Sequence, residues 1–214
     1  MKTVSLFLPS TSASRWSAFI HPSIDDRPAT GVSCANEHHR LCVPACILRP
    51  AKQDDLPFLR QLYHSFRSDE LARIPWSQED KQAFLDQQFN LQHRYYVAAF
   101  PQADFLIIEK DGTSIGRLYI DFDAHIWHIV DIGFLPECRN LGLGSGTLKA
   151  IQHAAVTREI PGIALHVDRN NTRAYDLYMA LGFVVIKTTV THIRMEWRSH
   201  RLLPEPADEP SGVN

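Results

Sequence analysis

Large apolar residues recur every three or four positions in two segments near the middle of the chain. The first segment follows a short apolar strand that ends at Arg49, and it carries Leu56, Leu59, Leu62, Tyr63 and Phe66. The second begins at Ser77, with Asp80 three residues later as an acidic form of the capping box. Both patterns predict amphipathic helices.

Extended apolar segments follow these helices. DFLIIEK and SIGRLYIDFD are joined by Asp111 and Gly112, a pair that predicts a tight antiparallel hairpin, and HIWHIVDIGFL predicts a third strand. The pattern then gives a helix over about residues 144–159, the strand GIALHVD, a helix that ends at Gly182 and two short strands. The predicted order is β-α-α-β-β-β-α-β-α-β-β, an α/β chain.

The two ends of the chain show neither the alternation of a strand nor the three-to-four-residue spacing of a helix. Residues 1–44 are rich in Ser, Pro, Ala and Thr, and residues 199–214 are rich in proline. We therefore expect a poorly ordered leader over 1–44, one folded domain over 45–198 and a C-terminal tail over 199–214.

Charge and hydropathy narrow the function classes. The 22 Lys and Arg residues nearly balance 24 Asp and Glu residues without long blocks of one sign, so nucleic acid and membrane partners are not expected. No apolar run approaches the roughly 18 residues of a membrane span, and MKTVSLFLPS has too short an apolar core for a signal peptide. The expected location is the cytoplasm.

The four cysteines make a poor disulfide framework for a chain of this length, so we expect reduced thiols. One cluster could supply zinc ligands: Cys34, His38, His39, Cys42 and Cys46. Its spacing matches no common zinc pattern, and the plainer interpretation is a leader without a metal.

The stretch PECRNLGLGSGTLKAI places glycines between an apolar strand and a helix, which predicts an anion site made of backbone N–H groups. A Walker A loop is excluded because Thr147, not lysine, follows Gly146. A dinucleotide fingerprint would need G-x-G-x-x-G close behind its strand, whereas seven residues separate Phe134 from Gly142. Only Asp168, at the end of the next strand, favours that alternative.

Two motifs together resemble a known superfamily. Arg139 to Gly144 form R-x-x-G-x-G, and Asn171 to Phe183 form N-x-x-A-x-x-L-Y-x-x-L-G-F, in the order and at the distance typical of GNAT acetyl-CoA-dependent N-acetyltransferases. The resemblance covers about residues 45–198. It implies a mixed, mostly antiparallel, twisted sheet of about six or seven strands, splayed between the fourth and fifth, with about four flanking helices.

The same resemblance implies a place for acetyl-CoA as co-substrate. The pyrophosphate would lie on the loop amides of Arg139, Asn140, Leu141, Gly142, Leu143, Gly144 and Ser145, with a charged contact from the Arg139 side chain as an option. The pantetheine arm would pair with the backbone near Ile132, Phe134 and Leu135. Asn171 would either bond near the pantetheine or cap the last helix.

The implied reaction is direct attack of an amine on the thioester in a ternary complex. Tyr178 would protonate the leaving thiolate, and the Phe134 N–H would stabilise the oxyanion. His128 and Asp131 are equal candidates for the general base, beside proton loss through solvent. Period 2 places these two on opposite faces of a regular strand, so a bulge would be needed for both to face the cleft.

The acceptor is expected to be a small-molecule or peptide amine. Residues available to contact it are Phe66, Trp76, Gln87, Gln88, Tyr95, Tyr96 and His192, with Asp121 and Asp123 as options for holding a cation or as a plain strand end. The last strand pair could support a homodimer by sheet extension. An acetyl-CoA-binding sensor or assembly domain without turnover stays open as the alternative function.

Overall fold

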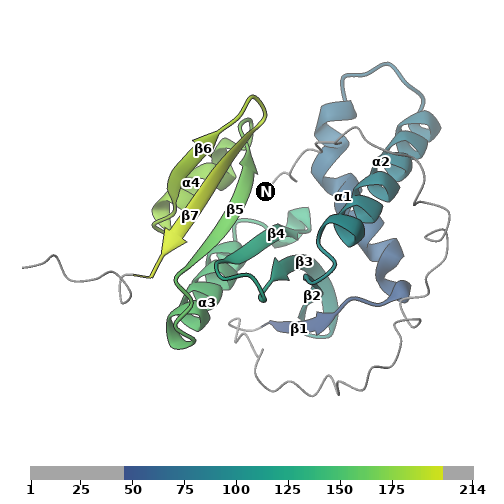
Figure 1. Ribbon diagram of the computed structural model, residues 1–214. Helices are drawn as coiled ribbons and strands as arrows, with labels where there is room; N and C mark the ends of the chain where they lie inside the picture. The colour runs from purple at the N-terminus through teal and green to yellow at the C-terminus, as the bar shows by residue number, and fades with distance from the viewer. Residues whose placement is uncertain (1–45, 200–214) are drawn as a thin grey trace, which may run out of the picture.

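The computed structural model describes residues 46–199, which form one sheet with helices on both faces (Figure 1). The strands are β1 (Ile47–Pro50), β2 (Asp104–Lys110), β3 (Thr113–Asp121), β4 (Trp127–Phe134), β5 (Gly162–Asp168), β6 (Val184–Thr188) and β7 (His192–Arg198). The helices are α1 (Leu56–Leu71), α2 (Gln78–Ala99), α3 (Leu143–Thr157) and α4 (Thr172–Ala180), with short 3-10 turns η3 (Gln53–Asp55) and η4 (Pro136–Cys138). The predicted order of helices and strands is confirmed.

The seven strands lie in the order β1-β2-β3-β4-β5-β7-β6. Every neighbouring pair is antiparallel except β4 and β5, which are parallel. This arrangement confirms the predicted mixed, mostly antiparallel sheet.

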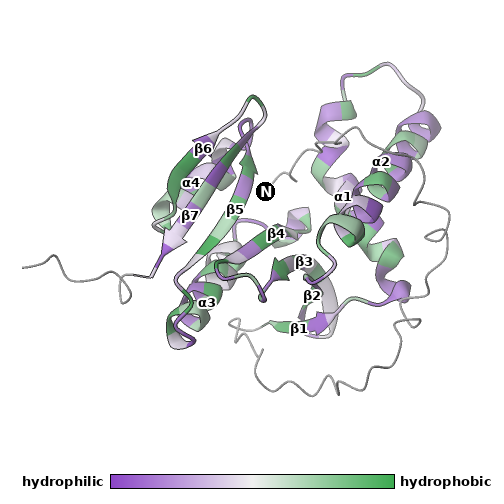
Figure 2. Cartoon of the chain, viewed as in Figure 1, coloured by the Kyte–Doolittle hydropathy of each residue, from purple (hydrophilic) through white to green (hydrophobic). Residues whose placement is uncertain are grey.

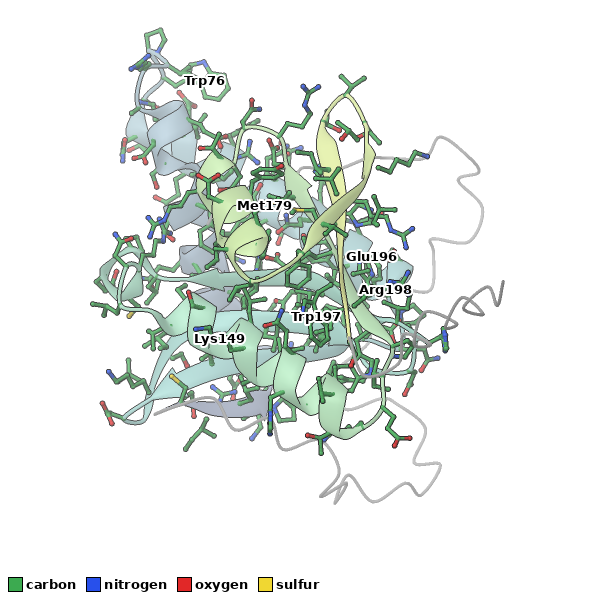
Figure 3. The ribbon with its side chains drawn as sticks, turned by 90° about the vertical axis from the view of Figure 1, so that its left-hand side faces the viewer. Trp76, Lys149, Met179, Glu196, Trp197 and Arg198 are labelled. Atoms are coloured by element: carbon green, nitrogen blue, oxygen red, sulfur yellow. The ribbon has the colours of Figure 1, made fainter. Side chains whose placement is uncertain are left out.

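Each face of the sheet has its own apolar core. On one face α3 and α4 contribute Leu148, Ile151 and Tyr178 to the larger cluster, and on the other α1 and α2 contribute Tyr63 and Phe89. Figure 3 labels Lys149 and Met179 on the α3 and α4 side. Helices on opposite faces leave the centre of the sheet, around β4, buried from both sides.

Local sequence signals fix several element ends. The Ser77 hydroxyl accepts a hydrogen bond from the Asp80 N–H at 3.0 Å, which caps α2 as expected. Asp111 and Gly112 join β2 to β3 with positive φ angles of 51° and 76°, the conformation of a tight hairpin turn. Gly182 ends the last helical turn with φ 82°, where a side chain would be strained.

The parallel contact between β4 and β5 is short. Only Trp127, His128 and Ile129 pair with β5, opposite Ile163, Ala164 and Leu165, and the two strands then separate. The predicted splay between the fourth and fifth strands is confirmed. It leaves the second half of β4 with a backbone edge that none of the described strands occupies.

A β-bulge lies in β4 at the start of this splay. Tyr119 pairs with Asp131 and the next residue, Ile120, pairs with Ile129, so Val130 is the extra residue. The bulge shifts the alternation by one position, and both His128 and Asp131 consequently face α2. The bulge that we expected to be needed is therefore present, and His128 and Asp131, the two candidate bases, lie on the same face of the sheet.

Several expectations fall on other parts of the chain. The leader over 1–44 lies outside the described residues, as do Cys34, His38, His39 and Cys42 of the cysteine cluster, and nearly all of the tail. Cys46 is described and half-buried, and burial raises the pKa of its thiol. Within residues 46–199, no helix is both long and apolar enough to cross a membrane.

Candidate functional site

The open edge of β4 presents backbone groups to the splay. The Leu135 N–H donates to the Ile115 carbonyl of β3 at 2.9 Å. Because alternate residues of an antiparallel strand point to opposite sides, Ile132 and Phe134 direct their backbone groups away from β3 and toward the gap. Among the predicted pantetheine contacts, Ile132 and Phe134 direct backbone groups to the gap, although the Phe134 carbonyl accepts from Arg139, and the Leu135 N–H is already used.

The loop after β4 exposes the amino end of α3. Asn140 and Gly142 have positive φ angles of 65° and 77°, and the first helical hydrogen bond runs from the Gly146 N–H to the Gly142 carbonyl at 2.8 Å. The N–H groups of Leu143, Gly144 and Ser145 precede that bond and have no partner within the helix. No side chain caps Gly142, and no acidic residue lies in the first turn. This helix end can bind an anion.

Arg139 is used to anchor the loop. Its Nε donates to the Phe134 carbonyl at 2.9 Å, and its Nη2 donates to the Ser65 hydroxyl at 3.2 Å. Its guanidinium also lies over the Phe66 ring, 5.3 Å from the centroid. The side chain thus ties the anion loop to α1 and to the end of β4, while Arg173 of α4 bonds the Asn140 side chain.

Asn171 caps α4. It is buried, and its side-chain oxygen accepts a hydrogen bond from the Ala174 N–H at 3.2 Å. Of the two roles proposed from the sequence, capping is the one that its contacts display. A pantetheine contact by Asn171 stays a prediction.

Tyr178 lies in α4, buried beside the splay. Its ring centroid is 5.7 Å from that of Phe183, and its side chain belongs to the core between α3, α4 and the sheet. Burial raises the pKa of Tyr178, and the nearby carboxylate of Asp131 raises it further. The phenol therefore keeps its proton at neutral pH and can act as a donor.

Asp131 forms a buried ion pair that the sequence did not reveal. The Arg117 Nη2 donates to the Asp131 carboxylate at 2.6 Å, and both side chains are almost fully buried. The same Nη2 donates to Gln92 of α2 at 3.2 Å. The guanidinium also lies over the rings of Phe66 and Tyr119. The Asp131 carboxylate is thus already engaged by a buried guanidinium.

His128 is neutral at physiological pH. Burial, with smaller contributions from His166 and Arg194, lowers the pKa of His128 to about 4, and Asp121 opposes this shift. The His128 ring lies 5.5 Å from the Phe100 ring at the end of α2 and 5.6 Å from the His166 ring on β5. Its lone pair can accept a proton, although the groups around it favour the neutral form.

The predicted acceptor residues fall into two groups. Phe66, Tyr96 and His192 are buried, whereas Trp76 is exposed and packs edge-on against Phe84. Gln87 of α2 is exposed, and Gln88 and Tyr95 on the same helix are half-buried. The Asp121 carboxylate accepts the Asp123 N–H at 3.0 Å, which is the turn expected at a strand end.

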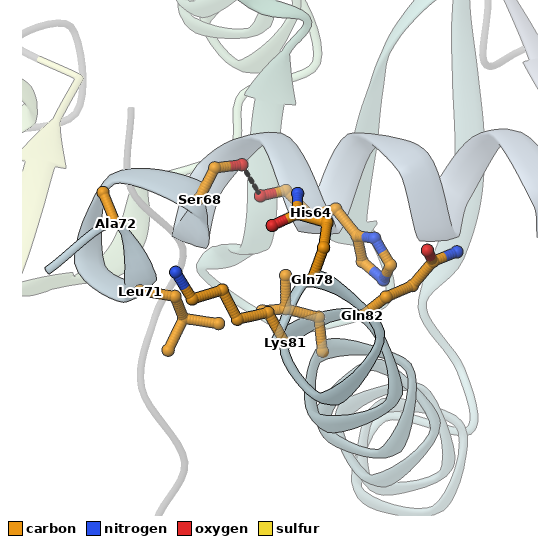
Figure 4. A pocket seen from close by; sticks show the side chains of 8 residues that line it. His64, Ser68, Leu71, Ala72, Gln78, Lys81 and Gln82 are labelled. Atoms are coloured by element: carbon orange, nitrogen blue, oxygen red, sulfur yellow. Dashed lines mark hydrogen bonds between the residues drawn. The ribbon is translucent and has the colours of Figure 1, made fainter. Parts of the chain in front are cut away.

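A separate hollow lies between α1 and α2 (Figure 4). It has a volume of about 470 Å³ and is lined by His64, Ser68, Leu71, Ala72, Gln78, Lys81, Gln82 and Leu85. None of the predicted cofactor or catalytic residues lines it. The hollow is therefore separate from the β4 edge, the α3 amino end and the side chains around His128.

An uncovered strand edge beside a glycine-led helix end defines an acyl-coenzyme-A type of site in a splayed mixed sheet. Residues 59–183 match the acetyltransferase (GNAT) family. The chain belongs to this family, so the resemblance drawn from the two motifs is confirmed.

Relatives and solved structures agree with that assignment. The chain is 27% identical over 113 residues to a mycothiol acetyltransferase of Streptomyces griseus, and 35% identical over 104 residues to one of Acidimicrobium ferrooxidans. These matches span 52% and 46% of this chain but only 36% and 33% of the relatives.

The fold is similar to that of the PaiA N-acetyltransferase of Thermoplasma acidophilum in complex with coenzyme A, with TM-score 0.55 and 20% identity over 72% of this chain and 99% of that one. It is also similar to a spermidine N-acetyltransferase of Vibrio cholerae, solved with CoA and spermine, with TM-score 0.50 and 19% identity over 72% of this chain and 95% of that one.

Proposed function

We propose that the protein is an N-acetyltransferase that moves the acetyl group of acetyl-CoA to a primary amine of a small molecule or peptide. The observation that carries the proposal is the open β4 edge at Ile132 and Phe134 beside the uncapped amino end of α3. A strand edge and a helix end in this order suit the amide groups and the pyrophosphate of coenzyme A.

The residues present fit acetyl-CoA. The amides at the start of α3 would hold the pyrophosphate, and the glycine at 142 adopts a φ of 77° that other residues rarely take. The backbone of Ile132 would pair with the pantetheine arm, beside the Phe134 N–H. Acetyl-CoA supplies an activated acetyl group as a thioester.

The chain's own groups supply the remaining chemistry. The Phe134 N–H, which points into the splay, would stabilise negative charge on the carbonyl oxygen, and Tyr178 would donate its proton to the leaving sulfur. The raised pKa of Tyr178, caused first by burial, keeps that proton available at neutral pH.

For the general base we favour His128 over Asp131. His128 is half-buried and neutral, whereas Asp131 is bonded to Arg117 at 2.6 Å in a closed pair. Asp131 would act through its charge, which holds Arg117 in place. The same charge raises the pKa of Tyr178, for which burial is the larger cause. An incoming amine would lose its proton to His128 or to solvent during attack.

The proposed class of amine acceptor is based on the names of the similar proteins. Mycothiol acetyltransferases and a spermidine N-acetyltransferase are named for small molecules, and the matched regions of the former cover about a third of their length. We therefore propose a small-molecule or peptide amine without naming it.

Ligand-dependent stability tests the proposal first. A ligand at about 100 times its dissociation constant stabilises a protein by roughly 2.7 kcal/mol, which raises the unfolding midpoint by a few degrees at this size. Acetyl-CoA and CoA should raise the midpoint and NAD should not. A response to NAD alone would replace the proposal with dinucleotide binding.

Substitution of Tyr178 separates an enzyme from a sensor. Tyr178→Phe should lower turnover of an amine panel by about 10²–10⁴-fold, because it removes the proton donor, while the affinity for acetyl-CoA stays the same. Tyr175→Phe, on the same helix, is the matched control and should keep activity. Tight acetyl-CoA binding without turnover by the unmodified protein would favour the sensor.

A further inference from the structure

Basic side chains gather on three adjacent strands where the sheet splays open. His128 lies on β4, His166 on β5 and Arg194 on β7. The His128 and His166 rings are 5.6 Å apart, and His166 pairs directly across the strands with Arg194. His192 lies two residues before Arg194 on β7 and pairs with Asp168. We call His128, His166 and Arg194 the basic cluster.

The strand alternation directs this cluster away from the α3 and α4 core. Leu165 and Val167 of β5 belong to that core, as does Met195 of β7. His166 and Arg194 lie between these positions and therefore point to the opposite face. His128 points to the same face because it packs against Phe100, the residue that follows α2. The three side chains thus share the face of the sheet on which the candidate base lies.

Two arginines, Arg194 of the cluster and Arg198 beside it, share one carboxylate, while the histidines of the cluster have lowered pKa values and are neutral at physiological pH. Glu196 is buried and is shared by two guanidinium groups, with Arg194 at 2.6 Å and Arg198 at 2.5 Å, so one carboxylate serves two cations. Figure 3 labels Glu196 and Arg198 on β7.

The other acids near the cluster are Asp121, which faces His128, and Asp168, which faces His192. Burial lowers the pKa of His166, and Arg194 and His192 lower it further.

We propose that the amine acceptor carries a carboxylate or phosphate that binds against His166 and Arg194 while its amino group lies next to His128. The inference rests on the proposed acetyltransferase function and specifies its substrate class. Histidine and arginine donors on adjacent strands can bond two oxygens of one anion. Arg194 keeps nearly half of its side chain exposed, at 45%, and His166 is exposed, so both can be reached.

Such an acceptor would also improve the base. After burial, the basic groups of His166 and Arg194 are the neighbours that help to lower the pKa of His128. An anion bound to them offsets their charge and raises that pKa toward its ordinary value near 6.5. Binding of the acceptor would thereby make His128 a better proton acceptor only when a substrate is present.

The test compares acceptors that differ in one anionic group. A dipeptide is matched with its C-terminal amide, and an amino sugar phosphate with its parent amino sugar. We expect the charged member of at least one pair to have a kcat/KM about tenfold higher or more. Preference in only one pair identifies the anion as a carboxylate or a phosphate.

Two arginines of β7 provide the variant and its control. Both bond Glu196 and are similarly exposed, at 45% and 47%, but Arg194 lies opposite His166 whereas Arg198 lies opposite Gly162, at the closed end of β5. R194M should raise KM for the charged acceptor about tenfold and abolish the preference. R198M should leave both unchanged. Thermal midpoints of the two variants control for folding.

The outcomes separate this inference from the proposed function. Turnover without charge preference, or equal effects of R194M and R198M, overturns the anionic acceptor and leaves the acetyltransferase intact. Without turnover of any amine, acceptor dissociation constants in the presence of CoA decide the inference. Tighter binding of the charged members, lost in R194M, supports it, and equal binding overturns it.

Discussion

Arg117 and Asp131 are the most deeply buried opposite charges among the described residues, and they flank the β4 bulge. Removing two charges from water is costly, so such a pair is retained for what it orders as much as for stability. Here it connects β3, β4 and, through Gln92, α2. That connection holds the bulge that turns Asp131 to the same face as His128.

The pair predicts a structural phenotype for Asp131. Asp131→Asn should lower the free energy of unfolding by about 3–5 kcal/mol, because it leaves the buried Arg117 charge without a counter-ion. Urea unfolding measures the change, with Asp121→Asn as a control at the less buried strand end. Full stability with complete loss of turnover would instead make Asp131 the base.

His128 predicts a pH dependence of stability. Burial and the neighbouring basic groups lower its pKa to about 4 in the folded protein, against about 6.5 when unfolded. Between these values the unfolded chain binds more protons, so stability is full above about pH 6.5 and is lost as the pH falls toward 4.

His128→Gln should flatten the free energy of unfolding over that window, measured by urea titrations at several pH values. His125→Gln changes an exposed histidine of the same region and should leave the slope as it was. An unchanged slope in the His128 variant would show that its pKa is not depressed by folding.

At the scale of elements, β6 is the exposed edge of the sheet. All its residues are exposed, and Val184, Val185 and Ile186 form a continuous apolar run, which Figure 2 shows in green. An exposed, apolar edge strand is a template for pairing with another chain. We therefore keep the expectation of a homodimer by sheet extension.

Charge on this edge should disrupt such a dimer. Val185→Glu should shift the protein toward monomer in light scattering over a range of concentrations, because two copies would bury like charges. Lys149→Glu, on the exposed face of α3, is the control. A monomer at all concentrations in the unmodified protein would remove the proposal.

Local sequence patterns predicted the helices, strands and turns. The features that the sequence did not predict depend on contacts between residues far apart in the chain. Ser77 with Asp80 and Asp111 with Gly112 each act through neighbours in sequence, so their roles could be predicted from the sequence alone. The partner of Arg117 and the cross-strand pair of His166 with Arg194 depend on register, which the sequence does not state. An arginine within the apolar run SIGRLYI was a usable signal of a buried ion pair.

At the scale of the whole molecule, two halves of the sheet are joined by the short parallel contact of β4 and β5 and by the helices. The α1 and α2 core packs on β2, β3 and the bulge, while the α3 and α4 core packs on strands of both halves, from β2 to β5 and β7. The gap between the halves follows from the short β4 and β5 contact, with the basic cluster where the two strands begin to separate and the anion loop after the other end of β4. A ligand in the gap would connect both halves.

This architecture predicts where acetyl-CoA should slow hydrogen exchange. The N–H groups of Ile132 and Phe134 face the gap, and those that begin α3 have no partner within the helix, so all should exchange more slowly once the ligand supplies acceptors. The Leu135 N–H already bonds Ile115 at 2.9 Å and serves as an internal control. NMR of backbone amides with and without acetyl-CoA measures this. Protection spread evenly over both halves, without a maximum at β4 and α3, would place the ligand elsewhere.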